Sequence, residues 1–348
     1  MFKRKILVSA VILLIIATSL VIATGCGRQA KSDNGRQVIK VGYFPNVTHA
    51  QALVGLNDGT FQKALGSGMV IEEYTFNAGP SEIEAMLTGE IDLGYIGPVP
   101  AINGFAKSKG GLRIVAGAAD AGAILVARKG TNIKTVNDLD GKKVAIPQLG
   151  NTQDISLRNL LTEANLKDAA KGGTVTVIPA ENPDILTLLT KGEIDAALVP
   201  EPWGSRIIKQ AGASIVLDSS QVWRNGKYTT AVVIVSTKFL ETHPDVVEKW
   251  IKAHVELTER INGDKQATVV AINARLKKLT NKVLPEDVLK SSLQRITITY
   301  DPETDSIREF VNISLENGYI KEKIDTNKIF YLDILNKVLA QKGLKQMQ

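Results

Sequence analysis

Residues 87–100, LTGEIDLGYIGPVP, and residues 189–202, LTKGEIDAALVPEP, carry the same order of structural signals. In each copy an amphipathic segment leads into Gly-Glu-Ile-Asp, a short apolar stretch follows, and a Pro-x-Pro turn ends the unit. Glycine in this place is typical of a helix end, and proline of the first turn of the next helix. Each copy therefore predicts helix, strand and helix. Two copies about 100 residues apart, close to one domain length, indicate two similar α/β lobes.

The rest of the chain extends this pattern. Strand-like and helix-like segments alternate from residue 38 to residue 236, which predicts an α/β fold of two doubly wound, mainly parallel sheets. The β-branched segment 230–236 is expected to cross back to the first lobe, and the helical segments after Pro244 to complete it. Lobe one is thus predicted over 38–128 and 230–348, and lobe two over 129–229.

The composition bounds the function. The chain has 348 residues, a formal net charge of +6, three histidines and one cysteine. The positive charge is modest and spread out, which argues against nucleic acid as a partner. With a single cysteine there is no disulfide framework and no cysteine-based metal site, so we expect neither a metal nor a cofactor.

The first 26 residues form a separate segment with its own sequence pattern. Lys3-Arg4-Lys5 is a basic start, 6–22 is a nearly unbroken apolar run, and Ala23-Thr24-Gly25 places small residues directly before Cys26. This order predicts a secretory signal with a lipoprotein-type cleavage site, after which Cys26 would carry the lipid that holds the protein at the outer face of the cell membrane. The alternatives are an uncleaved membrane anchor and a structural thiol. Residues 27–37 are polar and predict a flexible tether.

Ligands of doubly wound sheets bind beyond the carboxyl ends of the strands, so every strand-to-helix loop is a candidate binding loop. These loops are rich in Gly, Asn, Thr, Ser, Gln and Pro, and they contain no Arg or Lys; they span 44–49, 77–82, 96–100, 118–122, 148–154, 179–183 and 199–204. Several lead straight into helices, whose free N–H groups and partial positive charge can hold an anion. Each single loop is explained as well by ordinary helix capping. The set, converging from two lobes, predicts a cleft for a small anion.

Four side chains in or beside these loops have competing interpretations. Trp203 either walls the cleft or packs between the lobes, and Asp154 is expected first of all to cap a helix. Glu201 is left open between an ammonium partner, a helix cap and a bridge between lobes. His49 is either a first-turn residue or a ligand contact, and it is the only plausible base. No nucleophile–histidine–carboxylate set, phosphate loop or metal-ligand pair is recognisable, so we expect no enzyme.

Four motifs resemble the solute-binding lipoproteins of ABC importers in the nitrate, sulfonate and taurine group. They are GYFPNVTHAQALVG (42–55), FNAGPSEIEAMLTGEIDLGYIGPVPAI (76–102), AIPQLGNTQDISLRNLL (145–161) and GEIDAALVPEPWGSRI (192–207). The resemblance covers about residues 38–260 and, less specifically, the C-terminal helices. It implies a type II periplasmic-binding-protein fold with two crossing strands and the ligand between the lobes. The sequence departs from well-known sulfonate binders at Gln148, Asn151 and Gln153, so the resemblance does not fix the ligand.

The resemblance also implies a function without catalysis. Such proteins capture a small oxyanion and deliver it to permease subunits driven by a separate ATPase. We expect an aliphatic sulfonate, with taurine, nitrate and bicarbonate as alternatives, and a pyrimidine-precursor binder or enzyme on the same fold as a further one. We also expect a monomer. The expected ligand-binding residues are Asn46, Thr48, His49, Asn77, Gly79, Ser81, Gly97, Gln148, Asn151, Thr152, Glu201 and Trp203.

Overall fold

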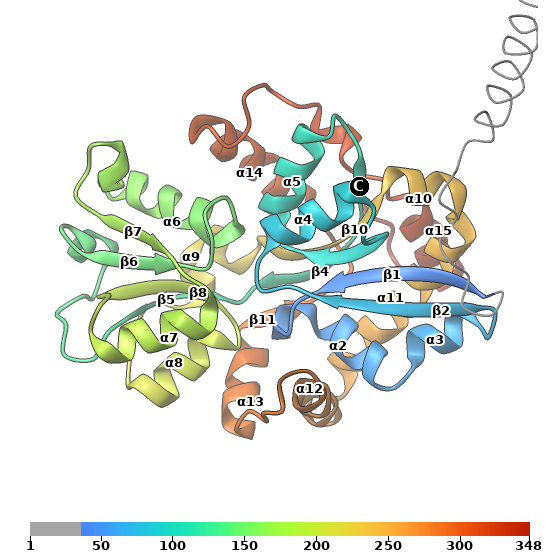
Figure 1. Ribbon diagram of the computed structural model, residues 1–348, viewed down its shortest axis with the longest axis horizontal. Helices are drawn as coiled ribbons and strands as arrows, with labels where there is room; N and C mark the ends of the chain where they lie inside the picture. The colour runs from blue at the N-terminus through green and yellow to red at the C-terminus, as the bar shows by residue number, and fades with distance from the viewer. Residues whose placement is uncertain (1–35) are drawn as a thin grey trace, which may run out of the picture. The chain divides into compact units, whose positions relative to one another are not determined.

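The structure is a computed structural model that describes residues 36–348. Cys26 and the segments predicted as signal and tether up to residue 35 lie outside the described residues. The described part holds a six-stranded and a five-stranded sheet (Figure 1). The first sheet has the order β11-β4-β10-β3-β1-β2, with bounds β1 Gln37–Tyr43, β2 Met69–Thr75, β3 Leu93–Ile96, β4 Leu112–Ala121, β10 Thr229–Ser236 and β11 Ile296–Ile298. The second has the order β7-β6-β8-β5-β9, with bounds β5 Ala123–Ala127, β6 Lys143–Ile146, β7 Thr176–Pro179, β8 Ala196–Pro200 and β9 Ser214–Leu217.

Each sheet contains antiparallel pairs that depart from the predicted parallel pattern, and β11 is antiparallel to β4. β10 is antiparallel to both β3 and β4, and β5 is antiparallel to both β8 and β9. The pairs β1–β3, β6–β7 and β6–β8 are parallel, as expected for strands joined by helices. Strands β5 and β10 follow the two places where the chain passes from one sheet to the other, and this explains their reversed direction.

The first passage between the sheets is tighter than expected. Residues 118–122 were predicted to be a binding loop, but β4 continues to Ala121 and only Gly122 separates it from β5. Gly122 has φ +79°, and a Cβ there would lie 2.5 Å from a side-chain carbon of Ile296, so glycine is required. By sheet membership the chain changes sides at residue 122, before the predicted boundary at 128. Residues 39–348 form one compact unit, so the division into two moving lobes stays a prediction.

The repeated sequence forms the same local structure twice, as predicted. α4 (Gly79–Thr88) ends at Gly89 with φ +79°, and α7 (Asn182–Lys191) ends at Gly192 with φ +76°. The aspartate of each copy ties the following strand to its parallel neighbour. Asp92 Oδ2 accepts a hydrogen bond from Lys40 N (2.9 Å) in β1, and Asp195 Oδ2 accepts one from Lys143 N (3.0 Å) in β6. The motif therefore encodes a helix cap, a buried isoleucine and a link between strands.

Helices cover the sheets and join them. The helices that precede β10 include the short η1 Val47–His49, α2 Ala50–Asn57, α3 Thr60–Leu65, α5 Pro98–Lys107, α6 Thr152–Glu163, α8 Trp203–Ala211 and α9 Ser219–Val222. The C-terminal helices are α10 Thr237–Thr242, α11 Pro244–Gly263, α12 Lys265–Thr280, α13 Glu286–Gln294, α14 Thr304–Glu316 and α15 Asp333–Gln341. α11 and α12 pack on α2, whereas α13 contacts α8 and α14 contacts both α5 and α6. The C-terminal helices therefore touch elements of both sheets, and not only the first lobe.

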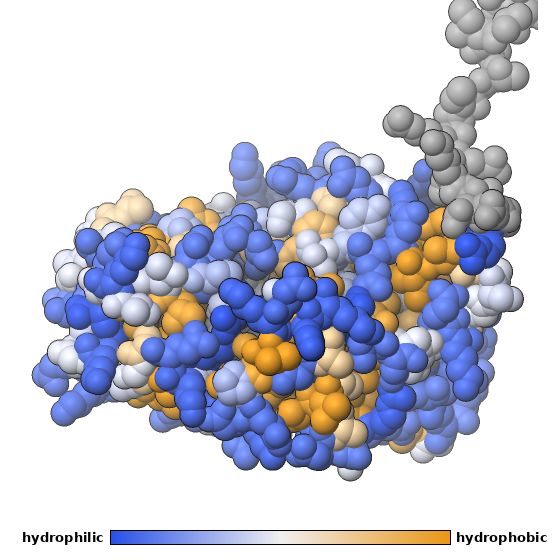
Figure 2. Space-filling model, turned by 60° about the horizontal axis from the view of Figure 1, so that its bottom comes forward, coloured by the Kyte–Doolittle hydropathy of each residue, from blue (hydrophilic) through white to orange (hydrophobic). Residues whose placement is uncertain are grey.

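The surface of the described part carries few exposed large apolar side chains. The face in Figure 2 is mainly hydrophilic, with separate apolar patches. Among the described residues the most exposed large apolar side chains are Val270 and Val283, at 62% and 59%. Within residues 36–348 no helix combines the length and the apolar character that a membrane crossing requires.

Candidate functional site

A cavity lies between loops of the two sheets. Its volume of about 30 Å³ is larger than the volume needed to hold a single water molecule. Neither Arg nor Lys is among the residues that line it. They are Phe44, Asn46, Thr48, His49, Asn77, Ala78, Gly79, Gly97 and Pro100 from the first-sheet side, Pro147, Asn151, Thr152, Gln153, Asn182 and Pro200 from the second-sheet side, and Thr230 from β10.

Four helices begin at this cavity. α4 starts at Gly79, α5 directly after Gly97, α6 at Thr152 and α7 at Asn182, and each of these residues lines the space. α4, α5 and α7 have no side-chain hydrogen bond to their N-terminal amides. The first turn of a helix leaves its N–H groups without helical partners and carries a partial positive charge. These helix starts therefore bring partial positive charge to the cavity without a cationic side chain, although the prolines in the first turns of α4, α5 and α7 contribute no N–H.

Two buried polar atoms in the cavity wall lack partners. Thr152 is 3% exposed and Asn182 is 4% exposed. Thr152 Oγ1 and Asn182 Oδ1 make no hydrogen bond within the protein. Most buried polar atoms in folded proteins are paired, so two unpaired ones in one wall indicate a place where a ligand supplies the partner.

His49 is a neutral hydrogen-bond donor at the cavity. Phe44 N donates a hydrogen bond to His49 Nδ1 (3.1 Å), so the neutral ring carries its proton on Nε2. The imidazole stacks on the Phe44 ring with 4.6 Å between centroids. Burial lowers the pKa of His49 to about 3, and the ring therefore stays uncharged at physiological pH.

Two side-chain bonds join the sheets beside the cavity. Trp203 Nε1 donates a hydrogen bond to Asn46 Oδ1 (3.1 Å), and the indole also packs under the Arg206 guanidinium at 4.0 Å. Trp203 is not among the residues that line the cavity, and its contact with a ligand stays a prediction. Asn77 Nδ2 donates to Glu181 Oε2 (3.0 Å), and both of these side chains are exposed. This second bond lies at the rim of the cavity.

Besides Trp203, three expected ligand residues do not line the cavity. Ser81 is exposed, and its hydroxyl donates to Ala78 O (2.9 Å) inside the first turn of α4, so it forms no capping box. Gln148 is half-buried and is not among the lining residues. Glu201 is fully buried away from the cavity, and it bridges the two sides of the protein. Its carboxylate accepts hydrogen bonds from Ser205 N and Oγ, Ser292 Oγ and Arg295 Nη1.

The structure brings the other eight expected residues together and adds eight lining residues, among them four with polar or aromatic side chains. Asn46, Thr48, His49, Asn77, Gly79, Gly97, Asn151 and Thr152 all line the cavity. Sequence reasoning did not select Phe44, Gln153, Asn182 and Thr230. Asn182 had a usable signal, because it lies in the predicted loop 179–183 directly before Pro183, a typical first-turn residue. Among the described residues no group of three or more His, Cys, Asp or Glu side chains is placed to hold a metal ion.

Comparisons with known proteins agree with this architecture. The chain is 24% identical over 346 residues to a protein of Bacillus subtilis (strain 168) named as an aliphatic sulfonates-binding protein, covering 96% of this chain and 97% of that one. It is 28% identical over 221 residues to the taurine-binding periplasmic protein of Escherichia coli (strain K12), covering 63% of this chain and 66% of that protein. Both relatives are therefore named as binding proteins.

The fold is that of a solved binding protein. The alkanesulfonate-binding protein SsuA from Xanthomonas axonopodis pv. citri, solved with bound MOPS, superposes with a TM-score of 0.71 at 16% identity, covering 85% of this chain and 98% of that one. The type II periplasmic-binding-protein fold expected from the sequence is thereby confirmed. The model of the NMT1-like family matches residues 32–275, and with this match over most of its length the chain belongs to the NMT1-like family.

Proposed function

We propose that this protein is the solute-binding component of an ABC importer that captures a small organic oxyanion, most specifically an aliphatic sulfonate. The observation that carries the proposal is the convergence of four helix starts on a cavity without Arg or Lys. Main-chain N–H groups and helix dipoles bind anions well, and they release them more readily than a buried lysine clamp would. Such a site suits capture followed by delivery.

Several donors in the cavity suit an anion that accepts hydrogen bonds, whereas Asn182 Oδ1 is an acceptor and would need a donor group on the ligand. His49 presents Nε2–H, Thr152 carries a free hydroxyl, and the first-turn amides add further donors. A sulfonate is ionised at all physiological pH values and has three acceptor oxygens. The oxyanion head would lie in the cavity, and an aliphatic tail would reach toward the rim between Asn77 and Glu181.

A second candidate is an amine-bearing sulfonate such as taurine. Glu201 does not serve as the ammonium partner, because Arg295, Ser205 and Ser292 already bond its buried carboxylate. Glu181 is the better partner. Its exposed carboxylate lies 3.0 Å from the amide of Asn77, which lines the cavity, and can therefore meet an ammonium group at the rim.

The remaining parts of the proposal concern the setting of the protein. Cleavage before Cys26 and lipidation of that thiol would hold the chain, as a monomer, at the outer face of the membrane beside its permease. Residues 38–121 with 229–348, and residues 123–217, would move as two lobes that close on the solute about Gly122 and the segment before β10. Nitrate and bicarbonate are weaker candidates, because they have no tail or ammonium group that could contact the rim between Asn77 and Glu181.

A binding titration tests the proposal. Calorimetry of the purified protein with ethanesulfonate, taurine, nitrate, bicarbonate and a pyrimidine should give the tightest binding with one of the two sulfonates. Thr152→Val should weaken that binding about five- to thirtyfold, because it removes one hydroxyl donor. Ser81→Ala is the matched control, since that hydroxyl lies outside the cavity.

Binding of the pyrimidine alone, or chemical turnover of a bound ligand, would refute the proposal. Turnover deserves its own assay, since a fold does not by itself separate binding proteins from enzymes. Ligand mixtures incubated with the protein and followed by mass spectrometry would reveal any product.

A further inference from the structure

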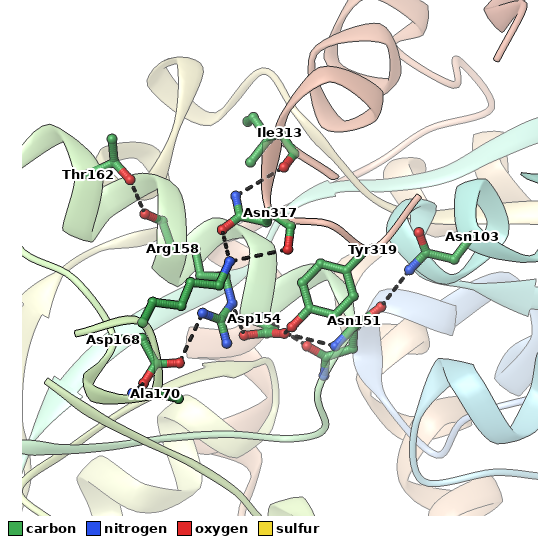
Figure 3. Close-up of polar contacts among 12 residues, drawn as sticks. Asn103, Asn151, Asp154, Arg158, Thr162, Asp168, Ala170, Ile313, Asn317 and Tyr319 are labelled. Atoms are coloured by element: carbon green, nitrogen blue, oxygen red, sulfur yellow. Dashed lines mark hydrogen bonds and ion pairs between the residues drawn. The ribbon is translucent and has the colours of Figure 1, made fainter. Parts of the chain in front are cut away.

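Asp154 holds the start of α6 through both of its carboxylate oxygens (Figure 3). The side chain is fully buried. Its Oδ2 accepts a hydrogen bond from Gly150 N (2.8 Å), and its Oδ1 accepts one from Arg158 Nε (2.9 Å). Its own backbone N–H donates to Asn151 Oδ1 (2.8 Å), which caps the helix. The carboxylate thus fixes the loop that carries Asn151 and Thr152 into the cavity.

A tyrosine from the other side of the protein reaches the same carboxylate. Tyr319 follows α14, which packs mainly on α5 of the first-sheet side and also contacts α6, and its hydroxyl donates a hydrogen bond to Asp154 Oδ2. Figure 3 shows the phenol ring extending toward Asp154, beside the guanidinium of Arg158. Burial and the bond to Asp154 raise the pKa of Tyr319 to about 12, so the hydroxyl keeps its proton and remains a donor.

Two further contacts from the first-sheet side hold neighbouring positions. Asn103 Nδ2 in α5 donates to Gly150 O (3.2 Å), and Lys171 Nζ donates to the backbone and side-chain oxygens of Asn317, both at 3.1 Å. Gly150 is therefore bonded through its N–H to Asp154 and through its carbonyl to Asn103. The start of α6 is held from both sides of the cavity at a point outside the cavity itself.

The hydrogen bond from Tyr319 can break without leaving the Asp154 carboxylate unpaired. Arg158, 7% exposed, pairs with Asp154 and also with Asp168 (3.0 Å), so Asp154 keeps a cationic partner on its own side of the protein. If Tyr319 withdraws, the carboxylate still has Arg158 and Gly150 N. Leaving a buried charge without a partner would be strongly unfavourable, and this arrangement avoids it. The contact is therefore suited to repeated opening and closing.

We propose that Tyr319 and Asp154 form a latch that positions the first turn of α6 at the cavity and slows the escape of a bound ligand. The inference rests on the proposed binding function and assigns to the segment after α14 a role outside the cavity. Tyr319 acts here as a positioning residue, because it reaches the ligand site only through Asp154. The latch should affect dissociation more than association, since the bond forms as the two sides come together.

Tyr319→Phe tests the latch, because it removes the hydroxyl and keeps the ring. Tyr331→Phe is the matched control, since Tyr331 is exposed and its hydroxyl makes no hydrogen bond within the described residues. Stopped-flow measurements with ethanesulfonate should show dissociation about five- to thirtyfold faster for Tyr319→Phe, and association changed less than about twofold. The control should match the wild type, and the melting temperatures without added ligand should stay close.

Hydrogen exchange separates failure of the latch from failure of the binding proposal, because it needs no added ligand. In Tyr319→Phe, amides 150–155 should exchange faster than in the wild type, and those of β1 and β3 should not change. Lys171→Met, which removes the second contact, should give a smaller change in the same segment. Unchanged exchange at 150–155 in both variants would overturn the latch. Wild-type protein that binds neither ethanesulfonate nor taurine would overturn the binding proposal alone.

Discussion

Gly97 and Thr152 approach each other from opposite sides of the cavity so closely that a Cβ on Gly97 would lie 2.4 Å from Thr152 Oγ1. Gly97 has φ −65° and ψ 149°, a conformation that any residue adopts. Glycine is therefore required here for space and not for its backbone freedom. The close approach shows that the starts of α5 and α6 are almost in contact across the cavity.

Gly97→Ala should accordingly weaken sulfonate binding about tenfold or more while changing the melting temperature little, because the new methyl group keeps the two helix starts apart. The double variant with Thr152→Ala removes the obstructing hydroxyl and should bind better than the two single effects predict. Calorimetry on the four proteins of this cycle gives the coupling. Strict additivity would show that the two residues do not meet in the bound protein.

Stability should depend on pH through His49. Its pKa is lowered from 6.5 to about 3 by burial, so between these values the unfolded chain binds a proton that the folded protein does not. Acidification through this window therefore favours unfolding, by roughly 1–2 kcal/mol at pH 5. Urea unfolding of His49→Gln should show a shallower loss of stability from pH 7 to pH 5 than the wild type. Equal slopes would mean that the imidazole is protonated in the folded protein.

Glu82 should be a source of instability at neutral pH. It is fully buried, neither of its carboxylate oxygens has a partner, and burial raises its pKa well above the usual range. Gly42 and Gly94 leave the space it occupies, since a Cβ on either would lie 2.6 Å or 2.1 Å from Glu82 Oε1. The folded protein therefore keeps a proton that the unfolded chain releases, and stability falls as the pH rises above about 4.3.

Glu82→Gln, which is neutral at every pH, should thus raise the melting temperature at pH 7.5, by an amount that corresponds to at least about 1 kcal/mol. The gain should shrink toward pH 4.5, where the unfolded glutamate also becomes protonated. Differential scanning calorimetry at the two pH values provides the comparison. A variant that is less stable at pH 7.5 would indicate that the carboxylate is ionised and has a partner.

Glu181→Gln should separate the two sulfonate candidates. It keeps an acceptor for Asn77 but removes the negative charge at the rim. Taurine binding should weaken about three- to tenfold, because its ammonium loses a partly exposed ionic partner, while ethanesulfonate binding should stay the same or improve slightly. Parallel titrations of both ligands decide this. An equal loss for both would assign Glu181 to the closure of the rim rather than to the amine.

Local signals made the repeated unit predictable. Gly89 and Gly192 end helices, and Pro98 starts one, for reasons contained in a few neighbouring residues. The prediction of a loop at 118–121 was wrong. The small residues of this segment favour a loop, but packing in the folded protein makes it a strand. At nearby Gly117 a Cβ would lie 1.9 Å from Asp301 O, a contact with a segment far along the chain.

The site residues divide in the same way. Asn151 and Thr152 were predictable because a helix start after a strand is a local pattern. The role of Glu201 was not predictable, because its hydrogen-bond donors Ser292 and Arg295 are far from it in the sequence. Thr230 reaches the cavity only because β10 is inserted between β3 and β4. Such contacts depend on the completed topology.

That insertion of β10 also sets an order of assembly for a chain made from its N-terminus. All five strands of the second sheet lie within residues 123–217, so this sheet is complete once that segment has emerged. The first sheet at that moment lacks its central member, and β3 and β4 have unpaired edges where β10 will lie. The first sheet, whose first strand is synthesised earliest, is therefore completed after the second sheet. A nascent chain that stops before residue 229 would leave β3 without its β10 neighbour and β4 without both β10 and β11, and such unpaired edges are the kind of surface that chaperones protect.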